Sequence, residues 1–457
     1  MDFSKIAESY QDQFINKLFP LLQIQSVYKK SDQYHYGKSI DDALNYMLRM
    51  AADDGFVSKN VDGYAGHIEF GQGEKLIGIL GHLDVVPAGE GWKNDPFQPV
   101  LEQGNIYARG AQDDKGPVIA AYMAMKLLKE KGFVPKKRVR LIMGTDEERD
   151  WQGIHYYFTK EEMPEFGFTP DACFPVIHAE KGLIDAYVTL AVPEVEGNAL
   201  LSFFSGDRLN MVPEQATATV LYNKSIEPYF QSYLDHQLLE GSLEKKDNMY
   251  VITMFGQTAH GSTPEAGVNA ALQLLSFLSS LQLETPHQTI VKYLVHSLAP
   301  TDGQGIECKF KDAVSGALTC NTGSVKWSMG AECQVGLNIR YPDSISYEKI
   351  LASLERFAVK GRGALNIYDH LKALHIEKDH PYVQTLLKIY NQTVNDTATP
   401  KAIGGATYAR ALQSGVAYGA LFKDSPDTAH QPNEHIRVVD MVKAIAIYAE
   451  AIYQLSK

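Results

Sequence analysis

A strand–helix–strand succession early in the chain constrains the fold most. The apolar run Lys75–Leu80 predicts a buried strand, and Arg138–Met143 predicts the next one. Between them, Pro117–Lys131 predicts a helix with Pro in its first turn, apolar residues on one face and Gly132 at its end. Strands joined through a helix are typical of a mostly parallel sheet covered by helices, so we expect an α/β fold. Apolar residues at helical spacing over Ile6–Leu22 predict one amphipathic helix packed on this domain.

The pattern changes near residue 184 and changes back near residue 376. Between these points we expect a small α+β domain with a few-stranded antiparallel sheet and two helices. Its strands are Asp185–Val192, Met249–Phe255 and Cys333–Arg340, and its helices are Val268–Leu281 and Ser346–Phe357. A helix, a strand and a final helix follow at Tyr382–Val394, Val416–Phe422 and Val438–Leu455. The sequence therefore predicts one α/β domain made of 1–183 and 377–457, interrupted by an inserted α+β domain over 184–376.

Composition excludes several classes of function. The chain has 43 basic and 55 acidic residues and a net charge of −12, so it lacks the basic face that binding to nucleic acid or to an anionic membrane requires. It has no apolar run of the ~18 residues that span a membrane and no signal-peptide pattern at the N-terminus. The four cysteines show no C-x-x-C pairing, which favours a reducing compartment, and we expect a cytoplasmic protein. Any metal must then be held by His, Asp and Glu.

Polar side chains that can bind metal follow the predicted strands. His82 and Asp84 come directly after the first strand and lie on the same side of an extended segment, so the carboxylate can hold one imidazole nitrogen and leave the other for a metal. Glu147 and Glu148 follow the second strand, and adjacent carboxylates repel each other unless they are protonated or neutralised, for which a divalent cation is suited. Taken singly, the first pair could be a surface histidine near an aspartate, and the second a solvated acidic turn.

Three more segments add to this set. Asp113 and Asp114 stand at the start of the predicted helix; capping accounts for one of these acids, and the flanking glycines indicate a constrained loop. Asp171 and His430 lie in loops, where each alone could be an ordinary turn or surface residue. In an open α/β sheet such positions cluster at the carboxyl ends of the strands. Together they offer ligands for two hard or borderline cations.

Four motifs follow one another along the chain. They are Gly81-His82-Leu83-Asp84-Val85-Val86-Pro87, the segment from Arg109-Gly110 to Asp113-Asp114-Lys115-Gly116-Pro117, Glu147-Glu148, and Ala429-His430 with Asn433-Glu434. This series resembles the motifs of the M20 metallopeptidase family, and most closely those of its PepV-like (Xaa-His) dipeptidase branch in bacteria. The resemblance covers nearly the whole chain. It implies a catalytic α/β domain with an inserted lid domain, which agrees with the fold expected from the pattern.

The resemblance also implies roles for individual residues. Five of them would hold two divalent cations, Zn²⁺ with Mn²⁺ or Co²⁺ as alternatives: His82, Asp113, Glu148, Asp171 and His430. Asp113 would bridge the two cations, because it keeps the family's interval to Glu147. Asp84 would be the partner of His82. Glu147 would be the general base that takes a proton from a water shared by the cations and delivers it to the leaving amine.

Three residues of the inserted domain resemble the family's substrate contacts. His260, in Gly256-Gln257-Thr258-Ala259-His260-Gly261-Ser262, would stabilise the tetrahedral oxyanion, and Asn210 would face the substrate. Arg340 would hold the α-carboxylate through its bidentate fork. Without the resemblance, these would be two turn residues and a surface charge. The segment Gly404-Gly405-Ala406 departs from the family's Gly-rich loop at Ala406, which leaves close backbone approach there open.

We expect a metal-dependent dipeptidase that acts on small peptides with a free N-terminus. An N-acyl-amino-acid amidohydrolase could use the same ligands, and the sequence does not separate the two. A non-catalytic metal-binding protein is a weaker alternative, since every ligand position and the base are present. A phosphoesterase would need a basic phosphate clamp, which is not evident near the ligands. The long insertion favours a monomer over a dimer.

Overall fold

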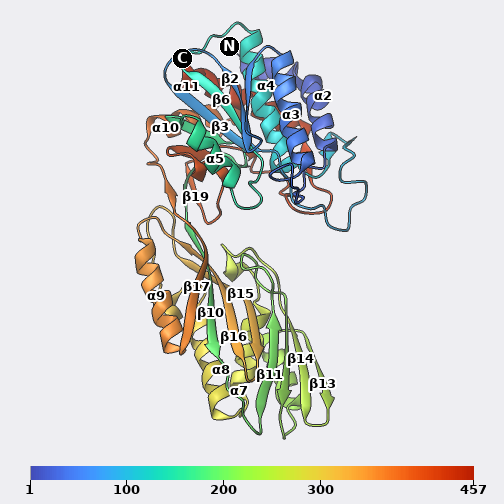
Figure 1. Ribbon diagram of the computed structural model, residues 1–457, viewed down its shortest axis with the longest axis vertical. Coiled ribbons are helices and arrows are strands. Elements are labelled where there is room, and N and C mark those ends of the chain that lie inside the picture. Colours follow the sequence, from blue (N-terminus) through green and yellow to red (C-terminus); the bar gives the residue numbers. More distant parts are fainter. Residues whose placement is uncertain (1) are drawn as a thin grey trace. The chain divides into compact units, whose positions relative to one another are not determined.

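The computed structural model describes residues 2–457, which form two compact units. The first unit contains the chain up to His178 together with 376–401 and 407–457. The second unit contains 179–375 and the short segment 402–406. In Figure 1 the first unit carries the blue and red ends of the sequence, and the second carries the green to orange middle. The second unit is therefore an insertion into the first.

The first unit is built on a mixed sheet whose centre is parallel. Its strands run in the order β1–β2–β6–β3–β7–β20, and β9 extends it where the chain leaves the unit. Strands β6, β3, β7 and β20 pair in parallel with one another, whereas the pairs β1–β2 and β2–β6 are antiparallel. The bounds are β1 Val57–Val61, β2 Ala65–Phe70, β3 Leu76–His82, β6 Arg138–Gly144, β7 Phe166–Thr169, β9 Ile177–Glu180 and β20 Gly415–Ala417. This arrangement confirms the expected α/β fold class.

Helices cover both faces of this sheet. One face packs against α4 and α11, whose apolar residues form one core with those of α1, α2, α3 and α10; the other face packs against α5 and the segment 407–412. Helix α4 is buried along nearly its whole length, which explains its uniformly apolar sequence. The bounds are α1 Phe3–Glu8, α2 Gln11–Gln23, α3 Lys38–Asp53, α4 Gly116–Glu130, α5 Gln152–Lys160, α10 Pro381–Val394 and α11 Val438–Ser456.

Two predicted elements of this unit are each divided in the structure. The helix expected over Ile6–Leu22 is two helices, because the chain turns between Glu8 and Gln11 while the side chains on both sides still reach one core. The strand expected over Val416–Phe422 is two short strands in different sheets, β20 and β21, since Gly419 adopts a φ of 82° between them.

Short strands complete the first unit. β8 (Ala172–Cys173) pairs with β21 (Ala420–Leu421), and β4 (Val100–Glu102), β5 (Asn105–Tyr107) and β22 (His435–Arg437) form a small antiparallel sheet. At the border with the second unit, β18 (Leu374–His375) and β19 (Lys401–Ile403) pair with β9. A single 3₁₀ turn occurs at Tyr408–Ala411, and the segment Ala111–Lys115 before α4 is interrupted by the extended backbone of Asp113.

The second unit is an antiparallel sheet with helices packed on one face. Its strands run in the order β13–β14–β12–β11–β15–β16–β10–β17. The bounds are β10 Gly182–Ala191, β11 Ala199–Ser205, β12 Gln215–Leu221, β13 Gly241–Lys246, β14 Met249–Phe255, β15 Thr319–Ser328, β16 Glu332–Tyr341 and β17 Gly363–Leu371. The helices are α6 Glu227–Gln237, α7 Ala270–Ser280, α8 Thr285–Leu298 and α9 Tyr347–Lys360, and single turns occur at Pro264–Ala266 and Gln304–Ile306.

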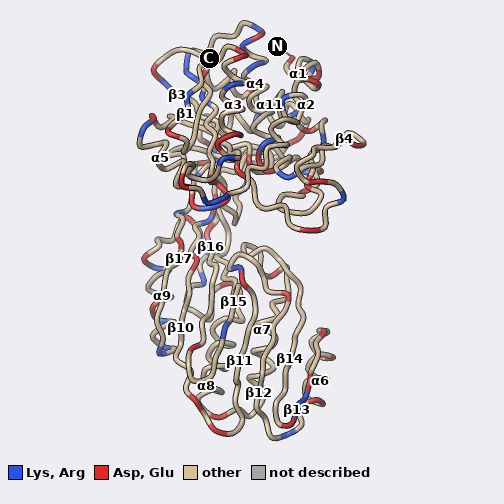
Figure 2. Tube along the Cα trace, turned by 45° about the vertical axis from the view of Figure 1, so that its right-hand side comes forward, with Lys and Arg blue, Asp and Glu red and all other residues tan. Residues whose placement is uncertain are grey.

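The α+β class of the insertion is as expected, but the expected few-stranded sheet with two helices is wrong in extent. The missed strands include β12, which alternates Thr with Ala and Val, and the exposed edge strand β13, which is rich in Lys and Glu. Such strands carry a weak apolar signal, because one face or one edge is solvated. No helix in residues 2–457 has the length and apolar character that crossing a membrane would need. Acidic and basic residues are interspersed over both units in Figure 2.

Candidate metal centre

The parallel strands of the first unit bring their carboxyl ends to one edge of the sheet. Strand β3 ends at His82, β6 ends just before the turn that carries Glu147 and Glu148, and β7 ends two residues before Asp171. Because β6, β3 and β7 are neighbours and parallel, these side chains come together. The sheet therefore assembles four acidic and imidazole groups from three distant stretches of sequence.

Close approach of the loop before α4 brings Asp113 to the same edge. The loop turns at Gly110, whose φ of 84° lies in the left-handed region that favours glycine. It then passes against Gly81, where a Cβ atom would lie 2.5 Å from an Asp114 carboxylate oxygen. That carboxylate accepts a hydrogen bond from the His82 backbone N–H at 3.2 Å. Any larger residue at position 81 would push the loop away from the strand.

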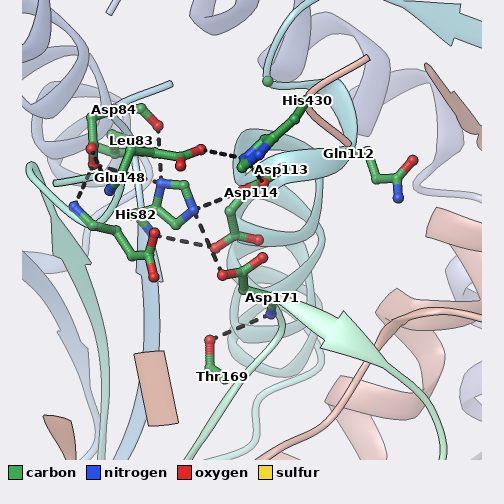
Figure 3. Close-up of polar contacts among 12 residues, drawn as sticks. His82, Leu83, Asp84, Gln112, Asp113, Asp114, Glu148, Thr169, Asp171 and His430 are labelled. Atoms are coloured by element: carbon green, nitrogen blue, oxygen red, sulfur yellow. Dashed lines mark hydrogen bonds and ion pairs between the residues drawn. The ribbon is translucent and has the colours of Figure 1, made fainter. Parts of the chain in front are cut away.

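Five side chains form two groups that share Asp113 (Figure 3). In the first group, His82 Nε2 lies 2.9 Å from Asp113 Oδ1 and 3.7 Å from Asp171 Oδ2. In the second, His430 Nε2 lies 2.9 Å from both Asp113 Oδ2 and Glu148 Oε1. The ligand atoms of each group all lie within 4.8 Å of one another. Asp113 thus presents one oxygen to each group, which is the arrangement of a bridging carboxylate.

Asp84 contacts residues of both groups. Its Oδ1 and Oδ2 accept hydrogen bonds from the backbone N–H groups of Glu147 at 3.1 Å and Glu148 at 3.0 Å. Its carboxylate lies 3.6 Å from His82 Nδ1, which donates its hydrogen bond to the Asp84 backbone carbonyl at 2.9 Å. In the neutral tautomer this contact leaves Nε2 free to bind a cation. Asp84 therefore orients His82 mainly through its backbone and holds the Glu147–Glu148 turn through its side chain.

The acids of this cluster perturb one another. Burial and the neighbouring charge of Asp113 raise the pKa of Asp171 to about 7. Burial also raises the pKa of Glu147 well above its usual range; the carboxylates of Asp171 and Glu148 add to this, while His82 opposes it. Hydrogen bonds to Asp113 and Glu148 raise the pKa of His430 to about 11. Burial opposes the charged form of Asp113, yet His430 and His82 hold its pKa below the usual range.

The donor set fits two divalent cations. Each group offers one imidazole nitrogen and two carboxylate oxygens, counting Asp113 twice, and such mixed N/O sets suit Zn²⁺, Mn²⁺ or Co²⁺. The excess of carboxylates over imidazoles leaves net negative charge in a largely buried cluster. A cation relieves this repulsion, which a purely structural cluster would leave uncompensated.

The three predicted substrate contacts lie together within the second unit. The Asn210 backbone carbonyl accepts a hydrogen bond from the Gly261 N–H at 2.7 Å, next to His260, and Met211 forms a β-bridge with His260. The positive charge of Arg340 contributes to lowering the pKa of His260, although burial is the larger cause. Arg340 donates to Asn338 Oδ1 at 3.0 Å and to the Gly404 carbonyl at 3.3 Å. The last contact gives the Gly404–Ala406 segment a place beside Arg340.

Two buried residues of the centre received no role from the sequence. Gln112 and Glu434 lie inside the quoted motifs, and both side chains bind loops that carry ligands. The sequence marks them only as polar residues next to predicted ligands, because the residues that they bind lie more than 300 positions away.

A sequence model described as Peptidase family M20/M25/M40 matches residues 78–454. The chain is 40% identical over 430 residues to "Putative dipeptidase YtjP" of Bacillus subtilis, covering 92% of each protein. It is 42% identical over 462 residues to "Putative dipeptidase SAB1611c" of Staphylococcus aureus, covering 98% of each. Its fold is similar to the crystal structure of human carnosine dipeptidase 1, with a TM-score of 0.62, 13% identity, and coverage of 99% of this chain and 98% of that one.

Proposed function

This chain belongs to peptidase family M20/M25/M40, and we propose that it is a metal-dependent dipeptidase. The proposal places the reaction at the cluster of the first unit, with His82, Asp113 and Asp171 holding one cation and Asp113, Glu148 and His430 holding the other. The substrate is a small peptide with a free N-terminus. The names of the curated relatives support this substrate class.

One observation carries the proposal above all others. The two oxygens of Asp113 face two separate imidazole–carboxylate pairs, each at 2.9 Å from a histidine nitrogen. A carboxylate shared in this way is what a dinuclear site needs, and two cations held there would lower the pKa of a bound water and polarise the scissile carbonyl. Hydrolysis of an amide bond is the chemistry that such a site performs within a peptidase family.

Glu147 is the proposed general base. It stands next to the ligand Glu148, and the ion pairs of the two ligand groups do not include its carboxylate. Burial and the surrounding acids raise its pKa, which strengthens this carboxylate as a proton acceptor. Glu147 takes a proton from the attacking water and delivers it to the leaving amine. Asp84 fixes the turn that carries it.

Asn210, His260 and Arg340 of the second unit are the proposed substrate contacts. His260 stabilises the oxyanion of the tetrahedral intermediate, Asn210 faces the substrate, and Arg340 binds the α-carboxylate. The second unit then serves as the lid of the catalytic domain. We further propose Zn²⁺ as the cation, which the His and carboxylate donors support, and a cytoplasmic monomer, which the cysteine pattern and the long insertion support. The motif resemblance supports membership of the Xaa-His dipeptidase branch.

A dipeptide panel and metal analysis test the proposal. The purified protein should hydrolyse dipeptides, lose activity in EDTA and regain it with a divalent metal. Glu147→Gln should keep the metal content of the wild type while kcat falls by about 10²–10⁴-fold, because only the proton transfer is removed. Glu355→Gln, an exposed glutamate of α9, is the matched control and should leave kcat unchanged. Normal turnover by Glu147→Gln would remove Glu147 from this role.

The deacylase alternative is tested with the same protein. N-acetyl amino acids should be poor substrates beside the corresponding dipeptides; the reverse preference would favour an amidohydrolase. For the carboxylate contact, Arg340→Ala should raise the KM of free dipeptides more than that of C-terminally amidated ones. Equal increases would show that Arg340 does not bind the α-carboxylate.

A further inference from the structure

Two loops that carry metal-centre ligands are tied together by three residues, which we call the loop clamp: Gln112, Thr428 and Glu434. The first loop, 109–115, carries Asp113, and the second, 427–434, carries His430. Both loops belong to the first unit, although more than 300 residues separate them in sequence. The clamp residues make their contacts to the loops rather than to the ligand side chains.

Gln112 fastens the loop of His430. Its Oε1 accepts hydrogen bonds from the Thr428 backbone N–H at 2.9 Å and from Thr428 Oγ1 at 2.7 Å. Its Nε2 donates to Asp427 Oδ1 at 3.1 Å. The side chain is buried and points away from the carboxylate cluster in Figure 3. Gln112 therefore uses both amide atoms to hold the second loop while its neighbour Asp113 faces the ligands.

Glu434 fastens the loop of Asp113 in return. Its Oε1 accepts from the backbone N–H groups of Gln112 at 2.8 Å and Asp113 at 3.1 Å, and its Oε2 accepts from Gly110 N–H at 3.2 Å. Oε2 also pairs with the buried Arg109 guanidinium, and Glu434 itself is fully buried. Each loop thus holds the other through a side chain next to, or close to, its own ligand.

The second loop needs such support because of its backbone. His430 and Asn433 both have a φ of 62°, in the left-handed region that non-glycine residues rarely adopt. The His430 side chain is also 53% exposed, so packing restrains it little. His82, by contrast, is fully buried at the end of a strand. The position of His430 therefore depends on what holds its loop.

We propose that Gln112 and Thr428 are positioning residues that set the affinity of the cation site formed by Asp113, Glu148 and His430. They act through the backbone of the 427–434 loop and touch neither cation nor substrate. Of the ligands of the other site, His82 and Asp171 follow strands of the sheet, and Asp113 keeps its backbone hydrogen bond to Glu434 when the Gln112–Thr428 contact is lost. Loss of that contact therefore weakens one site of the two. This inference rests on the proposed dinuclear centre.

Zinc titration of the metal-free, full-length protein tests it, with the bound equivalents followed by calorimetry. The wild type should bind two equivalents of Zn²⁺. Gln112→Met keeps the length of the side chain and removes both amide atoms; it should bind one equivalent as before and the other about 10- to 100-fold more weakly. Added zinc should restore kcat, since the substitution leaves the base and the substrate contacts in place.

Thr428 supplies a matched pair of variants should Gln112→Met fold poorly. Thr428→Val keeps the shape and removes the hydroxyl that donates to Gln112, so it should show the same selective loss. Thr428→Ser keeps the hydroxyl and should behave as the wild type. Equal weakening of both equivalents, or two unchanged equivalents in the Val variant, overturns the positioning role. A wild type that binds fewer than two equivalents overturns the dinuclear centre itself and the inference with it.

Discussion

The two halves of the ligand cluster are built in different ways. In the buried half, His82 ends a fully buried strand, and Asp171 follows the neighbouring strand. In the exposed half, Glu148 lies in a turn and His430 in a loop, with 53% of the His430 side chain open to solvent. Asp113 belongs to both halves. Figure 3 shows its carboxylate group between the two histidines.

This difference shows which interactions fix the position of each ligand. Backbone pairing within the sheet fixes the buried half, so its geometry comes with the fold. The exposed half depends on hydrogen bonds between side chains and loops, which single substitutions can remove. We therefore expect the buried half to be coupled to folding stability and the exposed half to be coupled to metal affinity. The following variants test that division.

The largest effect should come from the shared ligand. Asp113→Ala removes a donor from both halves, so both cations and all measurable activity should be lost. Elemental analysis after dialysis and a dipeptide assay measure the two effects. Asp150→Ala, at an exposed acid close to Glu148, is the control and should retain both. Two metal equivalents in Asp113→Ala would show that Asp113 does not bridge the cations.

The two histidines should differ in stability rather than in metal content. His82→Ala leaves buried carboxylates without their imidazole partner, and the unfolding free energy of the metal-free protein should fall by about 3 kcal/mol. His430→Ala also removes a carboxylate partner, but its side chain is half exposed and solvent screens its ion pairs, so it should cost less than His82→Ala. Each variant should lose one metal equivalent. Urea unfolding measures the first effect, and equal costs would contradict the division into a buried and an exposed half.

The sequence predicts the buried half better than the exposed half, for the same physical reason. Apolar runs such as those of β3 and β6 mark the strands, and residues at the ends of parallel strands must meet. The ligand roles of His82 and Asp171 follow from position and the motif resemblance, and they stay predictions until metal binding is measured. The α/β fold was predictable because it rests on long, strongly patterned segments, and the family was predictable because four motifs follow one another along the chain.

Long-range contacts of polar side chains were not predictable. Nothing in the sequence pairs Gln112 with Thr428, since hydrogen bonds between loops leave no periodic pattern. The sequence pattern also missed the half-solvated strands of the second unit, because β12 consists largely of Thr and Ala, which also occur in loops. The sequence thus predicts what hydrophobic burial determines and misses what individual hydrogen bonds determine.

Asp84 joins the two halves, so its substitution should weaken both. Asp84→Asn keeps the size of the side chain but cannot accept from the Glu147 and Glu148 N–H groups at once without turning its NH₂ toward one of them. We expect kcat to fall by about 10- to 100-fold and both metal equivalents to bind more weakly. Kinetic assays and zinc titration measure this, with Asp150→Asn as the control. If only one metal equivalent binds more weakly, Asp84 supports one half of the cluster and does not connect the two.

The smallest effect should appear as a pH dependence of the metal-free protein. Asp171 has a pKa of about 7 in the fold, raised by burial and by Asp113, against about 4 in an unfolded chain. A carboxyl group with a raised pKa favours the folded state fully below pH 4, and this contribution is lost as the pH rises through 7. The Tm of the metal-free protein should therefore fall over that interval.

Zinc should reverse this trend, because it binds the ionised carboxylate and relieves the repulsion. The increase in Tm on adding Zn²⁺ should be larger at pH 8 than at pH 5. Asp171→Asn cannot ionise, so its metal-free Tm should change less between pH 4 and 7 than that of the wild type. If the metal-free Tm of the variant and of the wild type falls equally between pH 4 and 7, ionisation of Asp171 does not destabilise the fold, and the buried half does not carry the repulsion that its carboxylates imply.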